Sequence, residues 1–160
     1  MNDTPDRRDA VRFLDALRAA AAASAEVLEA WITVCALDGL RGGLRVIAER
    51  EAGHAELIEE RLRELGEPCT AVLQAPVLAA AMERFGSSAI TDEEKLTLLL
   101  SRYPDDAAAT RPFAAMIEHL EDDTATRELL HLVVDGEVAT LNWLRAYHAG
   151  LARPPADRRA

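Results

Sequence analysis

Two glutamates and one histidine are the residues whose types and positions in this sequence could do chemistry. Glu51 and His54 are three residues apart, so on a helix their side chains can reach one ion. Glu137 lies much later in the chain, also among apolar residues. Carboxylate oxygens and an imidazole nitrogen together suit a divalent metal ion. These three residues are therefore candidate metal ligands.

Glu51 lies inside the apolar face of the helix that we expect over residues 44–65. At about 100° per residue, the apolar side chains of this segment form one stripe, with Glu51 in its middle and His54 at its edge. The stripe consists of Leu44, Ile47, Ala48, Ala55, Ile58, Leu62 and Leu65. The other glutamates of the segment point away from the stripe, as solvated acids do. Glu51 is thus distinguished by its position and not by its charge.

Glu137 has the same position within a second apolar face, on the helix expected over residues 126–151. This second stripe consists of Leu130, Val133, Val134, Leu141 and Leu144. A buried carboxylate without a partner costs several kcal/mol, so two such residues need an explanation. A bound metal ion would offset the cost. The alternative is a pair of interior carboxyls that share a proton, or that pair with His54 or with an arginine.

Helices separated by short polar segments are expected along most of the chain. The expected helices span residues 7–37, 44–65, 77–85, 91–103, 107–120 and 126–151. Gly39, Gly42 and Gly43 should form a short loop, which makes the first two long helices an antiparallel hairpin. Pro104 should break the third bundle helix, and the 67–90 segment is expected to be a connection that crosses the bundle. The residues after Pro155 are expected to form a loose tail.

Two segments resemble helices of a known superfamily. The segment Arg50–Leu57, continuing to Gly66, resembles the second bundle helix of the ferritin-like and rubrerythrin-like proteins, and Asp135–Leu144 is similar to their fourth helix. The fold we expect is therefore all-α: a ferritin-like four-helix bundle with a crossover connection that contains a short helix, and with a broken third helix. The resemblance also implies a di-iron or di-manganese centre, held by one glutamate from each of two helices and a Glu-x-x-His pair from each of the other two.

The ligand set that the resemblance implies is incomplete in this sequence. Glu51 and His54 match one Glu-x-x-His pair, but Thr140 stands where the histidine after Glu137 would be. On the first helix, Glu29 is the carboxylate nearest to the position expected to face Glu51, and the third helix has no glutamate at the matching position. The metal ligands predicted here are therefore Glu51, His54, Glu137 and Glu29.

Composition and charge bound the class of protein. The 160 residues are expected to form a single domain, with its core at about residues 8–151 and loosely ordered ends. The formal net charge of −10 and the scattered basic residues argue against nucleic-acid binding. No apolar run is long enough to cross a membrane, and the N-terminus lacks the apolar stretch of a signal peptide, so we expect a cytoplasmic protein.

Two functions remain open from the sequence. The first is a metal-binding protein with redox chemistry at iron or manganese, which would be a metal-dependent oxidoreductase with an unidentified small-molecule substrate. The second is a non-catalytic bundle that has lost the metal centre and acts as a binding or oligomerisation module. An apolar face on the first helix, with Val27, Val34 and Trp31, predicts a homodimer.

Overall fold

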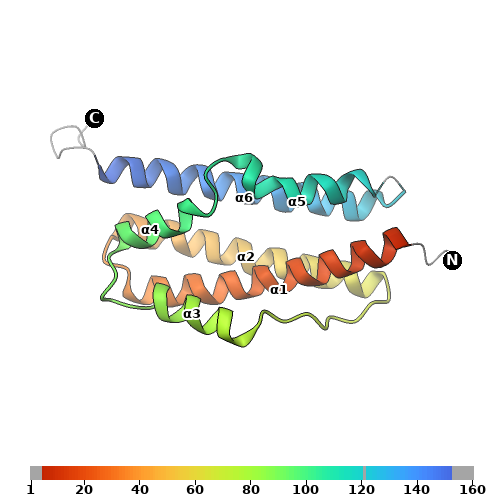
Figure 1. Ribbon diagram of the computed structural model, residues 1–160, viewed down its shortest axis with the longest axis horizontal. Coiled ribbons are helices and arrows are strands. Elements are labelled where there is room, and N and C mark those ends of the chain that lie inside the picture. The colour runs from red at the N-terminus through yellow and green to blue at the C-terminus, as the bar shows by residue number, and fades with distance from the viewer. Residues whose placement is uncertain (1–4, 121, 153–160) are drawn as a thin grey trace.

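The computed structural model describes residues 5–120 and 122–152, and every regular element in those ranges is a helix. The helices are α1 (Pro5–Val34), α2 (Asp38–Glu64), α3 (Ala75–Phe85), α4 (Asp92–Ser101), α5 (Asp106–Glu118) and α6 (Thr124–Leu151). Figure 1 shows α1, α2 and α6 running along the long axis, with α4 and α5 following one another beside α6. The all-α prediction is therefore confirmed for the described residues. The predicted tail after Pro155 lies outside them.

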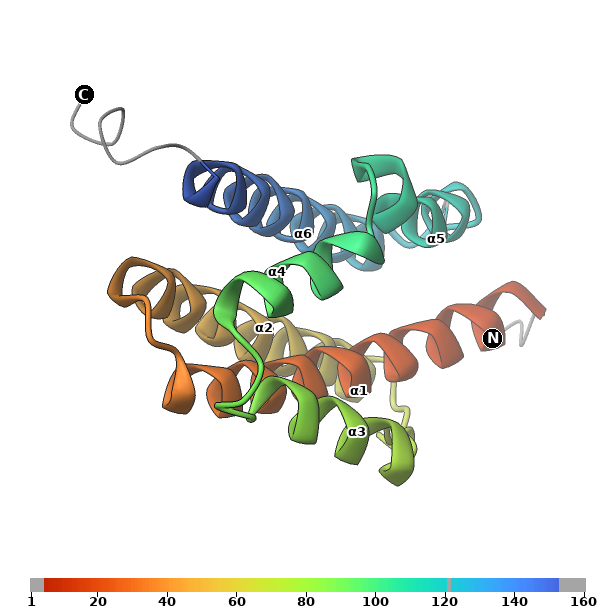
Figure 2. The ribbon, with the colours of Figure 1, turned by 60° about the vertical axis from the view of Figure 1, so that its left-hand side comes forward.

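The first two helices form an antiparallel hairpin whose turn is shorter than the sequence suggested (Figure 2). Only residues 35–37 separate α1 from α2. The predicted loop at Gly39, Gly42 and Gly43 is wrong, because these glycines lie in the first turns of α2. Two of them face aromatic rings of α6: a Cβ on Gly39 would lie 3.3 Å from the hydroxyl oxygen of Tyr147, and one on Gly43 would lie 2.0 Å from the Trp143 ring. The glycines therefore permit close helix packing and do not end a helix.

Replacing Gly43 by alanine is expected to destabilise the fold by about 1–3 kcal/mol, the typical cost of overpacking. The new methyl group would overlap Trp143, whose ring would have to leave its place against α2. Gly42→Ala is the matched control, because a Cβ there meets nothing within 4 Å and alanine favours helix. Urea unfolding of both variants measures the difference. Equal stabilisation by the two substitutions would contradict this packing.

Two apolar clusters hold the long helices together, one on each side of the middle of the molecule. The cluster near the α1–α2 turn includes Trp31, Leu44 and Leu144. The cluster at the other end includes Ile58 and Leu130. The two interior glutamates lie between these clusters, Glu51 on α2 and Glu137 on α6. The candidate site is thus placed in the centre of the bundle with apolar packing on both sides.

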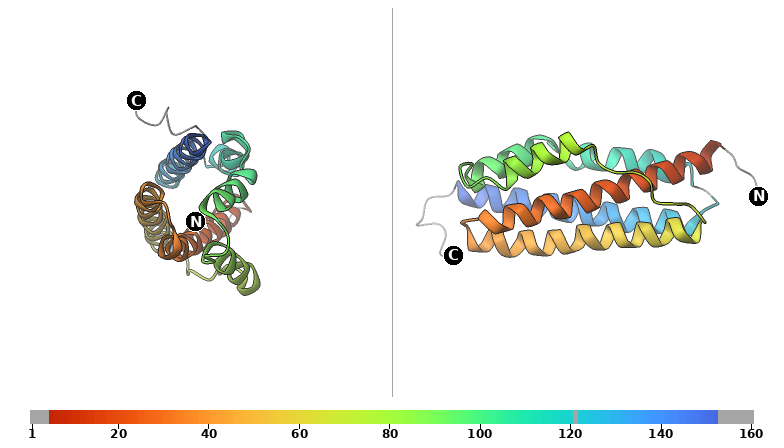
Figure 3. Two further views of the ribbon diagram at one scale, coloured as in Figure 1. Left: turned by 90° about the vertical axis from the view of Figure 1, so that its left-hand side faces the viewer. Right: turned by 90° about the horizontal axis from the view of Figure 1, so that it is seen from below.

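Trp31, the aromatic residue of the apolar face predicted on α1, is covered within the chain. Trp31 is fully buried, its ring centroid lies 5.3 Å from that of Phe85 on α3, and its indole nitrogen donates a 2.8 Å hydrogen bond to Asp92 on α4. Figure 3 shows α3 on the outer side of α1, away from α6. Trp31 is therefore not available to a partner, whereas Val27 and Val34 are half-buried, and the homodimer stays a prediction.

The break between α4 and α5 follows the local sequence. Thr91 caps α4 through a reciprocal pair of hydrogen bonds with Glu94, and the Asp105 carboxylate accepts a 2.8 Å hydrogen bond from the backbone N–H of Ala108 at the start of α5. Pro104 lies between the end of α4 and the start of α5, as predicted. α4 and α5 together therefore occupy one long side of the molecule as two shorter helices.

Candidate metal centre

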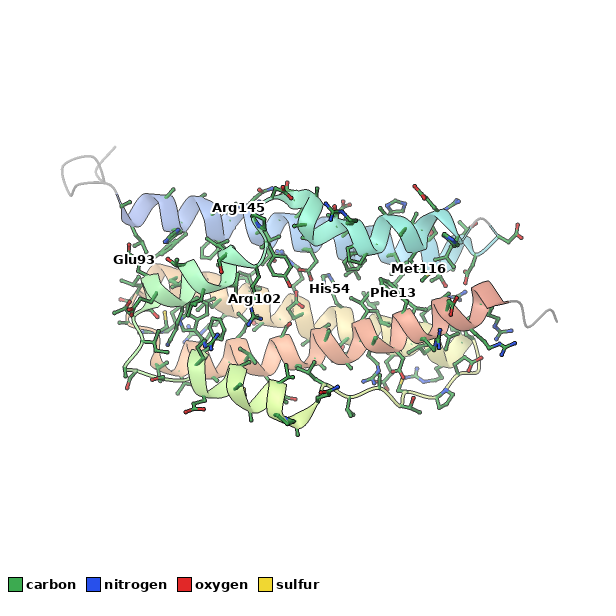
Figure 4. All side chains as sticks on the ribbon, in the orientation of Figure 1. Phe13, His54, Glu93, Arg102, Met116 and Arg145 are labelled. Carbon is green, nitrogen blue, oxygen red and sulfur yellow. The ribbon has the colours of Figure 1, made fainter. Side chains whose placement is uncertain are left out.

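The structure brings together three of the predicted ligands, from two helices distant in sequence. Glu51 and His54 lie on α2 and Glu137 lies on α6, and one ligand atom from each is within 4.8 Å of the others. Glu51 is 6% exposed and His54 5%, whereas Glu137 is half-buried. Figure 4 shows His54 in the space between the α1–α2 hairpin and the helices α5 and α6. Within the described residues, this group has the composition and spacing of a metal site.

His54 has a buried ring nitrogen without a partner. Its Nδ1 makes no hydrogen bond within the described part of the chain, and the nearest acidic atom, Oε1 of Glu51, is 3.9 Å away. Leaving such an atom unsatisfied costs about 1–3 kcal/mol. Burial, together with the positive charge of Arg50, lowers the pKa of His54, so the imidazole is neutral near pH 7. A neutral imidazole with a free lone pair is the form that binds a metal ion.

The two carboxyls share one proton near neutral pH. Burial raises the pKa of Glu51 to about 8, and the charge of Glu137 and a hydrogen bond to it act in the same direction. Burial also raises the pKa of Glu137, although the hydrogen bond from Glu51 and the charge of Arg50 oppose that rise. The proton therefore belongs to Glu51, and Glu137 accepts the hydrogen bond. A cation bound between the two carboxyls would replace this proton and offset the repulsion between the two negative charges.

Gly136 determines how closely the His54 ring can approach α6. A Cβ on Gly136 would lie 2.7 Å from Cε1 and 2.9 Å from Nε2 of His54, which is closer than side chains tolerate. The missing side chain thus lets the imidazole lie against the backbone of α6, beside Glu137. Sequence reasoning missed this residue, because nothing in the apolar pattern of the helix marks it.

A Gly136→Ala substitution is expected to weaken metal binding roughly 10–100-fold, as typically follows when a group that orients a ligand is changed. The methyl group would displace the buried His54 ring from its place against α6. Gly53→Ala, on α2 beside His54, is the control, because a Cβ there meets nothing within 4 Å. Competition with a chelator measures the affinity of each variant. Equal affinities in the two variants would disprove the orienting role.

Thr140, which stands where the resemblance would put a second histidine, is contacted by an arginine of α2. Nη1 of Arg50 donates hydrogen bonds of 3.0 Å to the carbonyl oxygen of Gly136 and 2.9 Å to the hydroxyl of Thr140. These bonds join α2 to α6 at the residue before Glu137 and at a residue about one helical turn after it. The hydroxyl of Thr140 is therefore engaged by a cation.

Glu29, the fourth predicted ligand, lies apart from this group. It is exposed on α1, where it lines a shallow groove together with Glu26 and Glu49. Because α2 begins at Asp38, counting back equally from the turn places the buried Ala21 opposite Glu51. The earlier expectation that a position near Glu29 faces Glu51 depended on the longer loop. The geometry of α1 thus supplies no carboxylate to the site.

No family model, no curated protein and no solved structure matches this chain. No helix in the described residues is long and apolar enough to cross a membrane. Function is therefore inferred from the geometry of the site itself.

Proposed function

We propose that this protein is a ferritin-like helical bundle that binds one divalent iron or manganese ion through Glu51, His54 and Glu137. In this proposal α1, α2, α6 and the pair α4–α5 are the four bundle helices, and residues 65–91 are the crossover connection. The observation that supports the ion most directly is the buried, unpaired Nδ1 of His54 beside two carboxyls. A divalent cation offsets the cost of all three buried groups at once.

The donor set favours iron or manganese among divalent ions. Two carboxylates and one imidazole are harder ligands than the thiolates that favour structural zinc, and Cys35 is buried near the α1–α2 turn, where its thiol faces the carbonyl oxygen of Leu37. An iron or manganese ion with three protein ligands keeps open positions and supplies redox chemistry toward a small substrate. The chain itself would hold the ion, release the proton of Glu51 and exclude water through the two flanking apolar clusters.

One ion per chain fits this site better than two. A second ion would need the histidine that Thr140 replaces, and further carboxylates from the other helices. Arg50 instead places a positive charge beside Thr140, and that charge repels a second cation. The centre we propose is therefore mononuclear.

Titration of the metal-free protein with Fe²⁺, Mn²⁺ and Co²⁺ under anaerobic conditions tests the proposal. We expect one ion per chain, and a loss of affinity of more than about 100-fold in His54→Ala and in the Glu51→Ala, Glu137→Ala double variant, since direct ligands contribute more than the groups that orient them. Glu49→Ala and His131→Ala remove exposed residues of the same types from the same two helices. The proposal fails if the wild type binds no ion, or if these two controls lose affinity to the same extent.

A non-catalytic interaction module is the second candidate, and two observations favour it. The carboxyl pair that shares a proton is a self-consistent arrangement without an ion. In addition, Val46 and Leu57 on α2 and Leu132 and Trp143 on α6 are large apolar side chains that remain exposed. Under this alternative the wild type is metal-free, the double glutamate variant is at least as stable, and light scattering after gel filtration finds the expected homodimer.

A further inference from the structure

The charge of Arg50 is not neutralised by the residues around it. Its Nη1 donates to two neutral acceptors, the carbonyl oxygen of Gly136 and the hydroxyl of Thr140. In the described part of the chain, no ion pair joins Arg50 to Glu51 or Glu137. The arginine is nevertheless close enough for its charge to act on both glutamates and on His54. The site therefore contains a cation in addition to any metal ion that it binds.

The charge balance of the loaded site follows from these residues. Two ionised glutamates neutralise a divalent ion, and the neutral His54 adds no charge. Arg50 then leaves the centre with one unbalanced positive charge, in a region where Glu51, His54 and Thr140 are all buried. Arg50 and Glu137 are themselves half-buried, and an uncompensated charge at a partly buried site is still costly. A monoanion at the open position of the ion would therefore be stabilised by both cations.

The hydrogen-bonding capacity of Arg50 is also incompletely used. The guanidinium group has five N–H donors, and within the described residues only those of Nη1 are engaged. Nε and Nη2 remain available on a side chain that is half-buried and therefore partly open to solvent. Guanidinium groups bind small anions such as carboxylates through parallel hydrogen bonds.

We propose that the loaded site takes a small monoanion as its external ligand and that Arg50 is the residue that selects it. This inference rests on the proposed metal function, because it concerns the position of the ion that the protein leaves open. The class of ligand is a compact anion of the size of azide or formate, and a neutral ligand of similar size would gain nothing from Arg50.

Azide titration of the Co²⁺-loaded protein, followed by the visible absorption of the ion, tests this inference, with imidazole as the neutral ligand. We expect azide affinity to fall at least tenfold in Arg50→Gln, while imidazole affinity stays within about twofold. The Co²⁺ affinity of each variant is measured first, so that both ligands are compared at full Co²⁺ loading. The control Arg45→Gln removes the same charge from an exposed position of α2 and should bind azide like the wild type. Arg50→Lys, which keeps the charge, should be intermediate.

The outcomes separate the two proposals. If the wild type binds no Co²⁺, the metal function is wrong and the anion site is wrong with it. If Co²⁺ binds and Arg50→Gln and Arg50→Lys bind azide as tightly as the wild type, only the role of Arg50 is overturned. Circular dichroism of each variant identifies any loss of folding, and the lysine variant keeps the test decisive if the glutamine variant unfolds.

Discussion

Metal affinity is expected to fall about tenfold for each pH unit below 8, because the ion must displace the proton that Glu51 holds. The pKa of Glu51 is raised to about 8, so near pH 7 most of the metal-free protein carries this proton. His54 adds no proton in this range, since its pKa is lowered. Calorimetry at pH 7 in buffers of different ionisation enthalpy should find close to one proton released per ion bound.

The change in metal affinity per pH unit is obtained from affinities measured with chelator-buffered Mn²⁺ between pH 6 and 8. The variant Glu49→Gln should show the same slope as the wild type, because this exposed glutamate is not part of the group. At lower pH the slope should become steeper, since the pKa of Glu137 is also raised and a second proton then competes with the ion. An affinity that does not change with pH would mean that neither glutamate binds the ion.

The stability that Glu51 contributes to the metal-free protein is expected to be lost as the pH rises from about 4.5 to 8. Glu51 has its ordinary pKa of 4.5 in the unfolded chain and about 8 in the folded chain, so the folded state binds the proton more tightly. Its contribution to stability is therefore complete below pH 4.5 and is lost as the pH approaches 8. At about 1.36 kcal/mol per pKa unit, a contribution of this sign amounts to a few kcal/mol at most.

The variant Glu51→Gln isolates this effect. A glutamine amide can still donate a hydrogen bond to Glu137 but carries no titrating proton. In urea unfolding, we expect the variant and the wild type to have similar stability at pH 5, and the variant to be more stable by up to a few kcal/mol at pH 8. Saturating Mn²⁺ should reverse the trend for the wild type, because binding strengthens with pH and stabilises only the folded state. Identical pH dependence of the unfolding free energy in the two metal-free proteins would show that the pKa of Glu51 is not raised.

Arg50 and Thr140 are the residues at which this site departs from the ligand set of the ferritin-like proteins that the sequence resembles. Where a second histidine would stand, the structure has Thr140, held by Arg50. The same arginine holds the backbone of α6 at Gly136, the residue that makes room for the imidazole of His54. In our proposal, one cationic side chain therefore limits the centre to a single ion and prepares its open position for an anion.

The sequence by itself determined the all-helical character of the chain and the position of Glu51, His54 and Glu137 on apolar helix faces. The position of Glu51 and Glu137 within an apolar stripe is a property of about two turns of helix on either side, so neighbours along the chain are sufficient to predict it. The same holds for the break at Pro104 and for the helix start at Thr91, where the capping residues are adjacent in sequence. Local patterns of this kind do not depend on which helix lies opposite.

Only the tertiary structure decided which side chains meet. Gly43 lies within α2 with Trp143 packed against it, and the start of α2 at Asp38 sets the register that leaves Glu29 outside the site and places Ala21 opposite Glu51. The contacts of Arg50 with Gly136 and Thr140 join residues 86 and 90 positions apart in the chain. A contact between two helices depends on their relative shift and rotation, and these are set by the packing of both helices together. The apolar pattern of one helix alone therefore does not predict the contact.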